Sequence, residues 1–379
     1  MIFDYETLRL IWWALLGALL IGFAITDGFD LGVAVLLPFL GKNDTERRVI
    51  INSIGATWEG NQIWLVTGGG ALFAAWPLAY SVAFSGFYFA LLLTLFALFL
   101  RPIGFDYRSK LPSPKWRSNW DIALFVGGLV PALIFGVAFG NLLQGVPFHF
   151  DNDMRIFYTG SFWALLNPFA LAAGVVSLSM LVMHGAVYLQ LKTEGDINRR
   201  SKTVVTVAAI ITLAIFAVAG LWVANIDGYH ITSEIIPNAP SNPLAKIVSK
   251  EPGLWLDNYA HCPMLWVIPA LAFIAGAATI VLSKADRTGL AFISSSLTLA
   301  SVILTAGVSM FPFLIPSSSA LNSSLTVWDA SSSLTTLKIM FGVTVIFLPI
   351  VVAYTTWVFR VLRGKITLEH IQQNDHTAY

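Results

Sequence analysis

The sequence predicts an all-α protein that crosses a membrane several times. Of its 379 residues, 56% are hydrophobic and only 11% are charged, whereas soluble domains carry about 25% charged residues. The mean hydropathy is +0.74. The apolar residues also gather in stretches of about 20 or more, which is the length that a helix needs to cross a bilayer. These observations together indicate a polytopic membrane protein.

Nine stretches are long and apolar enough to be read as membrane-spanning helices. The second is the least regular, because the polar run "TWEGNQIW" interrupts it, and hydropathy alone would omit it and give eight. The connections are short, and the two longer ones, 226–262 and 314–334, lack the apolar pattern of a separate domain. We therefore expect a single integral-membrane domain over residues 1–379. Its predicted helices cover 8–39, 49–76, 78–101, 119–143, 160–190, 203–225, 263–283, 288–313 and 335–360.

The basic residues predict how these helices are oriented. In the nine-helix arrangement, all but five of the 22 Lys and Arg residues fall on one side of the membrane. The positive-inside rule places that side in the cytoplasm, so the N-terminus is expected outside and the C-terminus inside. The first helix follows acidic residues and no small-residue cleavage site, so it is expected to be retained. The five exceptions are Arg9, Arg155, Lys246, Lys250 and Lys338.

Cysteine and histidine usage argues against a metal centre within this chain. Cys262 is the only cysteine, which excludes an internal disulfide and a cysteine-ligated cluster. Of six histidines, only His184 lies well inside a predicted helix, and haem or metal sites need more ligands than this. His184 is therefore interpreted as a hydrogen-bonded residue of the helix bundle. The net charge of +1 gives no reason to expect a nucleic acid partner.

Five charged residues in or beside the first three helices are the candidate functional residues. A charge in the membrane costs about 2.5 to 3.5 kcal/mol on insertion scales, so such residues are functional candidates. Asp27 and Asp30 are three residues apart and share one helix face. Glu59 lies roughly 15 Å into the second helix at 1.5 Å per residue, while Arg101 and Asp106 mark the inner end of the third. This graded series predicts a path for protons from the cytoplasm toward the middle of the membrane.

Structural roles are the alternative for several of these residues. Asp27, Asp30 and Arg101 are also expected to form an ion-pair network that joins helices near the cytoplasmic rim, where charge costs less. Asn61 is typical of amides that make hydrogen bonds between helices. Trp64, like Trp58, is interpreted first as a packing residue.

Taken as an ordered set, nine segments make the chain resemble subunit II of the cytochrome bd-type quinol oxidases, essentially from end to end. No single segment is diagnostic alone, but their order is highly specific. The segments are "TDGFDLG", "KNDTERRVIINSI", "WEGNQIWL", "GGALFAAWP", "AFSGFY", "RPIGFDYRSK", "GVAFGNLLQGVPF", "MFPFLIPSS" and "LTVWDASSS".

The resemblance implies two four-helix bundles plus one peripheral helix, paired with a similarly built subunit I in the bacterial cytoplasmic membrane. It implies that subunit I holds the b-type and d-type haems and oxidises quinol, so this chain ligates none of them. The complex would reduce oxygen to water with quinol, taking protons from the cytoplasm without pumping. Small single-helix accessory subunits, surrounding lipid and a structural quinone in this subunit are implied for some members.

The resemblance also assigns roles to individual positions. Asp27, Asp30, Glu59, Arg101 and Asp106 match polar positions near the subunit interface, with Glu59 as the inner member that passes protons toward the haem site. Trp64 matches a position near a suggested entry for oxygen.

Two other classes of function remain open at this point. A secondary transporter would use intramembrane acids for coupling, but such folds usually carry internal repeats, and none is evident here. A purely structural scaffold would use the same acids only to join helices.

Overall fold

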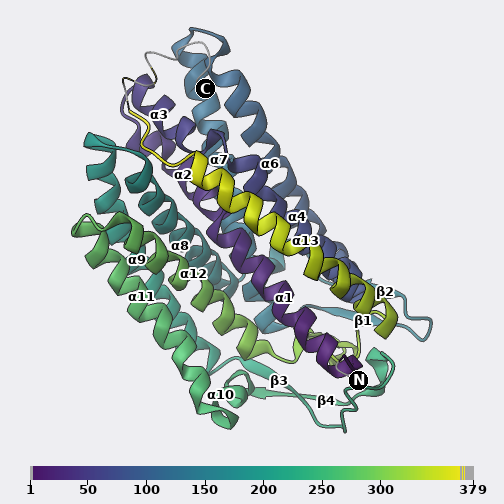
Figure 1. Ribbon diagram of the computed structural model, residues 1–379. Coiled ribbons are helices and arrows are strands. Elements are labelled where there is room, and N and C mark those ends of the chain that lie inside the picture. Colours follow the sequence, from purple (N-terminus) through teal and green to yellow (C-terminus); the bar gives the residue numbers. More distant parts are fainter. Residues whose placement is uncertain (1–2, 368, 370, 372–379) are drawn as a thin grey trace.

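The computed structural model describes residues 3–367, 369 and 371 (Figure 1). Long helices run alongside one another, and short hairpins close the end of the molecule at which the N-terminus lies (Figure 1). Within the described residues, eight helical segments are long and apolar enough to cross a membrane. They are Tyr5–Leu40, Tyr88–Lys110, Pro114–Gln144, Pro168–Lys192, Gly195–Val223, Pro263–Lys284, Thr288–Met310 and Leu334–Val361.

Most of the regular structure is helical, and the strands are short. The helices are α1 Tyr5–Ile25, α2 Asp27–Leu40, α3 Asp44–Gly55, α4 Trp58–Ala75, α5 Pro77–Gly86, α6 Tyr88–Tyr107, α7 Pro114–Gln144, α8 Pro168–Lys192, α9 Gly195–Val223, α10 Asp257–His261, α11 Val267–Lys284, α12 Thr288–Met310 and α13 Leu334–Val361. The strands form the antiparallel pairs β1 Phe148–Phe150 with β2 Ile156–Tyr158, β3 Asp227–Ile231 with β4 Val248–Pro252, and β5 Phe313–Ile315 with β6 Leu325–Thr326.

The first three predicted helices are not continuous, and this corrects their expected bounds. The first is interrupted at Thr26, where the hydroxyl donates to the Gly22 carbonyl at 2.7 Å. The second divides at residues 56–57 into α3 and α4. The third begins at Pro77, whose fixed φ suits a first helical position, and breaks at Phe87. Periodicity of apolar residues does not reveal such single-residue interruptions.

The helix α4 explains why eight and not nine segments pass a test of length and composition. Its first turn carries Glu59, Asn61 and Gln62, and these side chains lower its hydropathy, so α4 is absent from the eight apolar segments. It nevertheless packs alongside α1. The ninth membrane crossing and the sides on which the two termini lie stay predictions.

The fifth predicted helix begins later than expected. Residues 160–167 do not join it, and Trp163–Leu165 form a short 3₁₀ turn instead. The Asn167 side chain accepts a hydrogen bond from the Ala170 backbone amide at 2.9 Å, and Pro168 occupies the first turn. This combination of cap and proline fixes the start of α8.

The long helices contact one another in two groups. One group contains α8, α9, α11 and α12, and the other contains α2, α6 and α7 together with α1 and α4, which join through α1. The two groups meet where α8 packs on α2 and α7. Backbones approach closely there, since a Cβ on Gly32 would lie 2.1 Å from the Leu181 carbonyl oxygen. The helix α13 lies outside both groups, across α1 and α4 (Figure 1).

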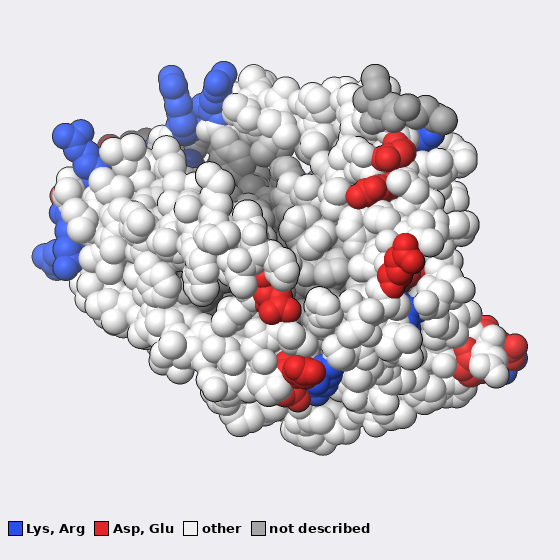
Figure 2. All heavy atoms as spheres, turned by 90° about the horizontal axis from the view of Figure 1, so that it is seen from below, with Lys and Arg blue, Asp and Glu red and all other residues white. Residues whose placement is uncertain are grey.

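Two buried cations stabilise the hairpin layer at the N-terminal end, and one of them, Arg9, joins it to a helix. Arg9 of α1 is fully buried and donates to the Ser331 hydroxyl at 2.8 Å and to the Pro237 and Ala239 carbonyls. Lys246 pairs with Asp329 at 2.9 Å. Acidic side chains are scattered over this face, and the most prominent basic ones stand at one edge of the view (Figure 2).

Candidate functional site

The interruption at Thr26 places Asp27 and Asp30 in the first turn of α2. A helix N-terminus carries unpaired amides and a partial positive charge, which favours acidic side chains there. Both carboxylates are nevertheless fully buried, so bulk solvent does not stabilise them. The sequence predicts that these two residues lie together, and the structure places them on one turn.

Asp27 is held by a buried ion pair. Arg101 of α6 donates through Nη2 to Oδ1 at 2.6 Å and through Nη1 to Oδ2 at 3.1 Å. Both side chains have 0% exposed surface, and the guanidinium lies 5.6 Å from the ring centroid of Trp58. Bidentate pairs of this kind are strong and geometrically specific. Asp27 therefore joins α2 to α6, as the structural alternative predicts.

Asp30 has a different environment from Asp27. The Asn61 side chain of α4 donates to Asp30 Oδ2 at 2.8 Å. The other oxygen, Oδ1, is buried and has no hydrogen-bond partner among the described residues. Asp30 is thus the carboxyl group of the pair with an oxygen free to hold a proton or to accept from water.

Glu59 and Asp106 do not join this buried group. Both side chains are exposed on the isolated chain, and neither carboxylate has a hydrogen bond or ion pair within the part of the chain that the structure describes. Glu59 lies in the same turn of α4 as Asn61. Trp64 is half-buried and packs over Gly22 of α1, where a Cβ would lie 2.5 Å from its ring.

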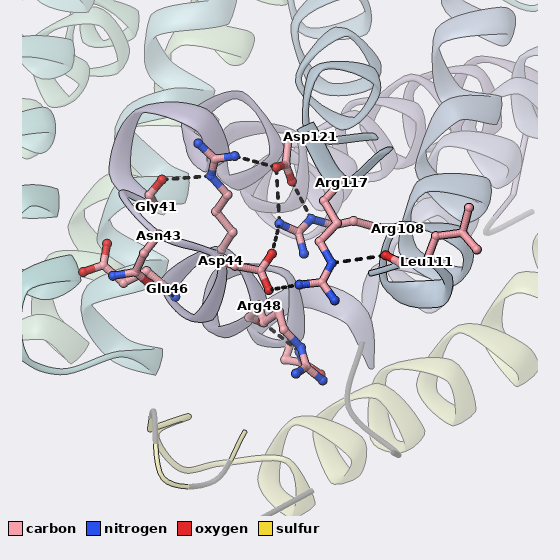
Figure 3. Close-up of polar contacts among 11 residues, drawn as sticks. Gly41, Asn43, Asp44, Glu46, Arg48, Arg108, Leu111, Arg117 and Asp121 are labelled. Carbon is pink, nitrogen blue, oxygen red and sulfur yellow. Dashed lines mark hydrogen bonds and ion pairs between the residues drawn. The ribbon is translucent and has the colours of Figure 1, made fainter. Parts of the chain in front are cut away.

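A second charged network, which the sequence analysis missed, lies at the end of the molecule where α2 meets α3 (Figure 3). Arg108 donates to the two oxygens of Asp121 at 2.5 and 3.2 Å and to Asp44 at 2.9 Å. Arg47 adds a bond to Asp121 at 2.7 Å, and Arg117 adds one to Asp44 at 2.7 Å. The network joins α3 and α7 to the 3₁₀ turn Arg108–Lys110 that follows α6. The sequence feature that could have indicated this network is Asp121, an acidic residue near the start of a predicted membrane-spanning helix.

Glu46 links the same end of α3 to α9. Arg200 donates to both of its carboxylate oxygens at 2.8 Å. The hydrogen bonds from Arg200 are the main reason why the pKa of the Glu46 carboxyl is below its usual value. Charge therefore joins α9, in one helix group, to α3 at the end of the molecule away from the N-terminus.

His184 of α8 is fully buried, and both of its ring nitrogens are occupied. Nε2 lies 3.0 Å from the Ile25 carbonyl oxygen, and Nδ1 lies 2.7 Å from the Ser295 hydroxyl. Neither nitrogen is free to ligate iron in this arrangement. No group of three or more His, Cys, Asp or Glu side chains suited to a metal ion occurs in residues 3–367, 369 and 371.

A cavity of about 640 Å³ separates parts of the two helix groups. Its walls come mainly from α7, α8, α9, α11 and α12 and are almost entirely apolar, including Phe139, Met180, Phe216, Phe273 and Val302. A cavity of this size suits an apolar ligand.

Comparison with known proteins decides the family. Residues 8–362 match the family described as cytochrome bd terminal oxidase subunit II. The chain belongs to this family. It is 55% identical over 377 residues to the cytochrome bd-I ubiquinol oxidase subunit 2 of Escherichia coli strain K12, covering 99% of this chain and 100% of that protein.

Other members of the subunit II family agree over most of their length. A probable cytochrome oxidase subunit 2 of Haemophilus influenzae is 55% identical over 376 residues, with 99% and 100% coverage. The cytochrome bd ubiquinol oxidase subunit 2 of Bacillus subtilis is 33% identical over 361 residues, covering 94% of this chain and 96% of that protein. The resemblance inferred from the ordered segments is confirmed.

The fold agrees with a solved structure of the same kind of enzyme. A chain of the bd oxidase from Geobacillus thermodenitrificans superimposes with a TM-score of 0.68 at 16% identity, covering 94% of this chain and 98% of that chain. This subunit II is therefore an all-α, multi-pass membrane protein and a subunit of a quinol oxidase, which implies a subunit I as its partner.

Proposed function

We propose that this subunit stabilises a haem-bearing subunit I and supplies it with protons from the cytoplasm for the reduction of oxygen by quinol. The observation that carries the proposal is Asp30, a buried carboxyl group with one oxygen free and the other bonded to Asn61. The same turn of α4 exposes Glu59. An acid inside the molecule and an acid on its surface are thus connected through one helical turn.

The two buried acids have separate tasks. Asp27 has both oxygens on Arg101, so its task is to fix α2 against α6. Asp30 holds the mobile proton at Oδ1, and the Asn61 amide keeps its other oxygen directed toward α4. The proton passes between Asp30 and Glu59 through water, because the Asn61 amide that lies between them does not release a proton near neutral pH. Cofactors bound to the partner supply the redox chemistry, and this chain's share is positioning and electrostatics.

The exposed face of α4 is the proposed contact with subunit I. Glu59, Ile63, Val66, Gly70 and Phe73 recur at intervals of four and three residues and are all exposed, so they form one helix face. A carboxylate facing lipid deep in the membrane is costly, whereas a protein partner can hydrogen-bond it. The face is otherwise apolar and includes a glycine without nearby atoms, which allows close approach of another helix.

The proposed direction of proton entry rests on the charged network of α3, α7 and the turn Arg108–Lys110. This end carries the cytoplasmic connections of the positive-inside prediction, with the N-terminus outside and the C-terminus inside. Asp27 and Asp30 stand at the outer end of α2, and the network stands near its inner end. Protons then enter between the charged network and the two buried acids, and they pass the first turn of α4, which carries Glu59. Asp106, which is exposed beside the network on α6, is proposed to lie at the entrance.

The haems fit the partner better than this chain. His184, the buried histidine of α8, has both nitrogens occupied, so we place the b-type and d-type haems in subunit I. The two helix groups and the outlying α13 support an arrangement of two four-helix bundles plus a peripheral helix. The proposal also includes single-helix accessory subunits, contacts with lipid of the bacterial inner membrane and oxygen access beside Trp64.

The apolar cavity is proposed to hold the structural quinone of this subunit. Its volume of about 640 Å³ and its aromatic walls suit a ring with an isoprenoid tail. Replacing Ala306, on the cavity wall, by Phe is expected to remove quinone that co-purifies with the complex while turnover continues. Retention of the full amount of quinone in Ala306→Phe would place it elsewhere.

A purely structural scaffold is the second candidate, and the ion pair of Asp27 with Arg101 favours it. Replacing Glu59 by Gln in the purified complex distinguishes the two functions. The proton path requires slower oxygen reduction with haem content retained, since the amide cannot carry a proton. Glu234→Gln, in an exposed loop at the other end, is the control and is expected to leave turnover unchanged. Unchanged turnover in Glu59→Gln would reject the proton path and favour the scaffold.

A further inference from the structure

The position of the two buried acids depends on the interruption between α1 and α2. Thr26 stands between the two helices with φ −94° and ψ −74°, and α2 begins with Asp27. An interruption of this kind releases carbonyl groups from the regular hydrogen-bond ladder, and a buried carbonyl needs another donor. The Ile25 carbonyl is directly before the interruption, two residues from Asp27 and five from Asp30.

The donor to this carbonyl is His184. A carbonyl oxygen only accepts, so Nε2 of His184 carries the hydrogen at 3.0 Å from Ile25. Nδ1 of the neutral ring is then the acceptor that lies 2.7 Å from the Ser295 hydroxyl, whose single hydrogen is shared between Nδ1 and the Phe292 carbonyl at 2.9 Å. The ring also stacks on Phe292, with 4.7 Å between centroids. Because Ser295 and Phe292 belong to α12, the imidazole is held on one side by that helix and binds the interruption with the other.

The backbones of α8 and α2 are in close contact next to His184. Gly185 faces Gly32 so closely that a Cβ on Gly185 would lie 2.7 Å from the Gly32 carbonyl carbon. A Cβ on Gly28 would lie 2.8 Å from a Leu181 methyl group. The helix α8 therefore contacts α2 along the turns that carry Asp27 and Asp30, and the imidazole secures the start of the same segment.

We propose that His184 is a positioning residue for proton transfer through Asp30: its hydrogen bond to the Ile25 carbonyl fixes where α2 begins, and so fixes Asp27 against Arg101 and Asp30 against Asn61. His184 does not carry the proton. The inference rests on the proposed proton path and adds to it the residue that holds its geometry. Displacement of a reacting group by about 1 Å is enough to reduce a rate about 100-fold, so a modest shift of α2 has a large effect on turnover.

The experiment compares three variants of α8 in the purified oxidase complex. His184→Leu removes the donor to Ile25. His184→Gln returns an N–H at a similar distance from the backbone. Gln190→Leu is the matched control, because Gln190 is a fully buried polar residue of the same helix that bonds to Ser283 and not to the interruption. Turnover per haem, its solvent isotope effect in D₂O and the thermal unfolding temperature are measured for each.

The proposal requires His184→Leu to lower turnover per haem at least about tenfold and to raise the solvent isotope effect, since transfer through a misplaced Asp30 becomes rate-limiting. His184→Gln is expected to restore both values toward wild type. Gln190→Leu is expected to lower the unfolding temperature without changing the isotope effect. If His184→Leu shifts only the unfolding temperature, as Gln190→Leu does, the positioning role is wrong.

A separate variant distinguishes this outcome from failure of the proton path itself. Asp30→Asn removes the proposed proton carrier and leaves His184 in place. Slow turnover in Asp30→Asn with normal turnover in His184→Leu would refute the positioning role and leave the path intact. Normal turnover in Asp30→Asn would refute the path, and the inference from His184 would fall with it.

Discussion

The ion pair between Arg101 and Asp27 gives the sharpest prediction for stability. Arg101→Met removes two donors, at 2.6 and 3.1 Å, from a carboxylate with 0% exposure. Leaving one member of a buried pair without its partner costs about 3 to 5 kcal/mol. Removing both charges, as in Asp27→Leu with Arg101→Met, eliminates the uncompensated charge and is expected to recover most of this loss.

The assay is denaturant unfolding of the purified complex in detergent, analysed as a double-mutant cycle. The control is Arg199→Met, whose pair with Asp196 at 2.8 Å is largely exposed, with 78% and 58% of the side-chain surfaces accessible. Exposed pairs contribute about 0 to 1 kcal/mol. If Arg101→Met is no more destabilising than Arg199→Met, the pair is not buried as described.

Three further outcomes follow from other contacts. Hydrogen bonds from Arg200 lower the pKa of Glu46 in the folded protein, so this carboxylate stabilises the fold at pH values above its unfolded pKa near 4.5. The unfolding temperature of wild type should therefore exceed that of Glu46→Gln at neutral pH, and the difference should shrink as the pH falls through the pKa of the folded state. Gly32→Ala, with its Cβ 2.1 Å from a carbonyl oxygen, should destabilise by about 1 to 3 kcal/mol or more, whereas Gly220→Ala, with open space, should not. Lys246→Met should lower the unfolding temperature of the complex at pH 7, because it leaves Asp329 without its buried partner at 2.9 Å. Equal unfolding temperatures for Lys246→Met and wild type would contradict the buried pair.

The sequence predicted the membrane-spanning character well because apolar length is a strong signal. It located all eight of the apolar segments, and it anticipated that the polar start of α4 would keep this helix out of a count based on hydropathy. It did not anticipate the interruptions at Thr26 and Phe87, because one residue changes neither the average hydropathy nor the period. The late start of α8 was missed although Asn167 and Pro168 form a recognisable cap.

The candidate site was predicted in part. A three-residue spacing correctly placed Asp27 and Asp30 on one face, and the structural alternative correctly linked Asp27 to Arg101, whereas Asp30 bonds to Asn61 instead. The partner of Asp30 was not predictable, since nothing in the sequence distinguishes Asn61 from Gln62 until α4 is placed against α2. The contact of His184 with the Ile25 carbonyl was also hidden, because it involves a backbone group that becomes available only when the helix breaks.

The central claim is that Asp30 carries protons from the cytoplasm to the partner subunit. Proton uptake during oxygen reduction by the reduced complex, followed with a pH indicator in proteoliposomes, tests it most directly. Asp30→Asn is expected to slow uptake from the cytoplasmic side with haem content unchanged, while the control Glu234→Gln, in an exposed loop at the other end, takes up protons at the wild-type rate. Wild-type uptake in Asp30→Asn would contradict the account.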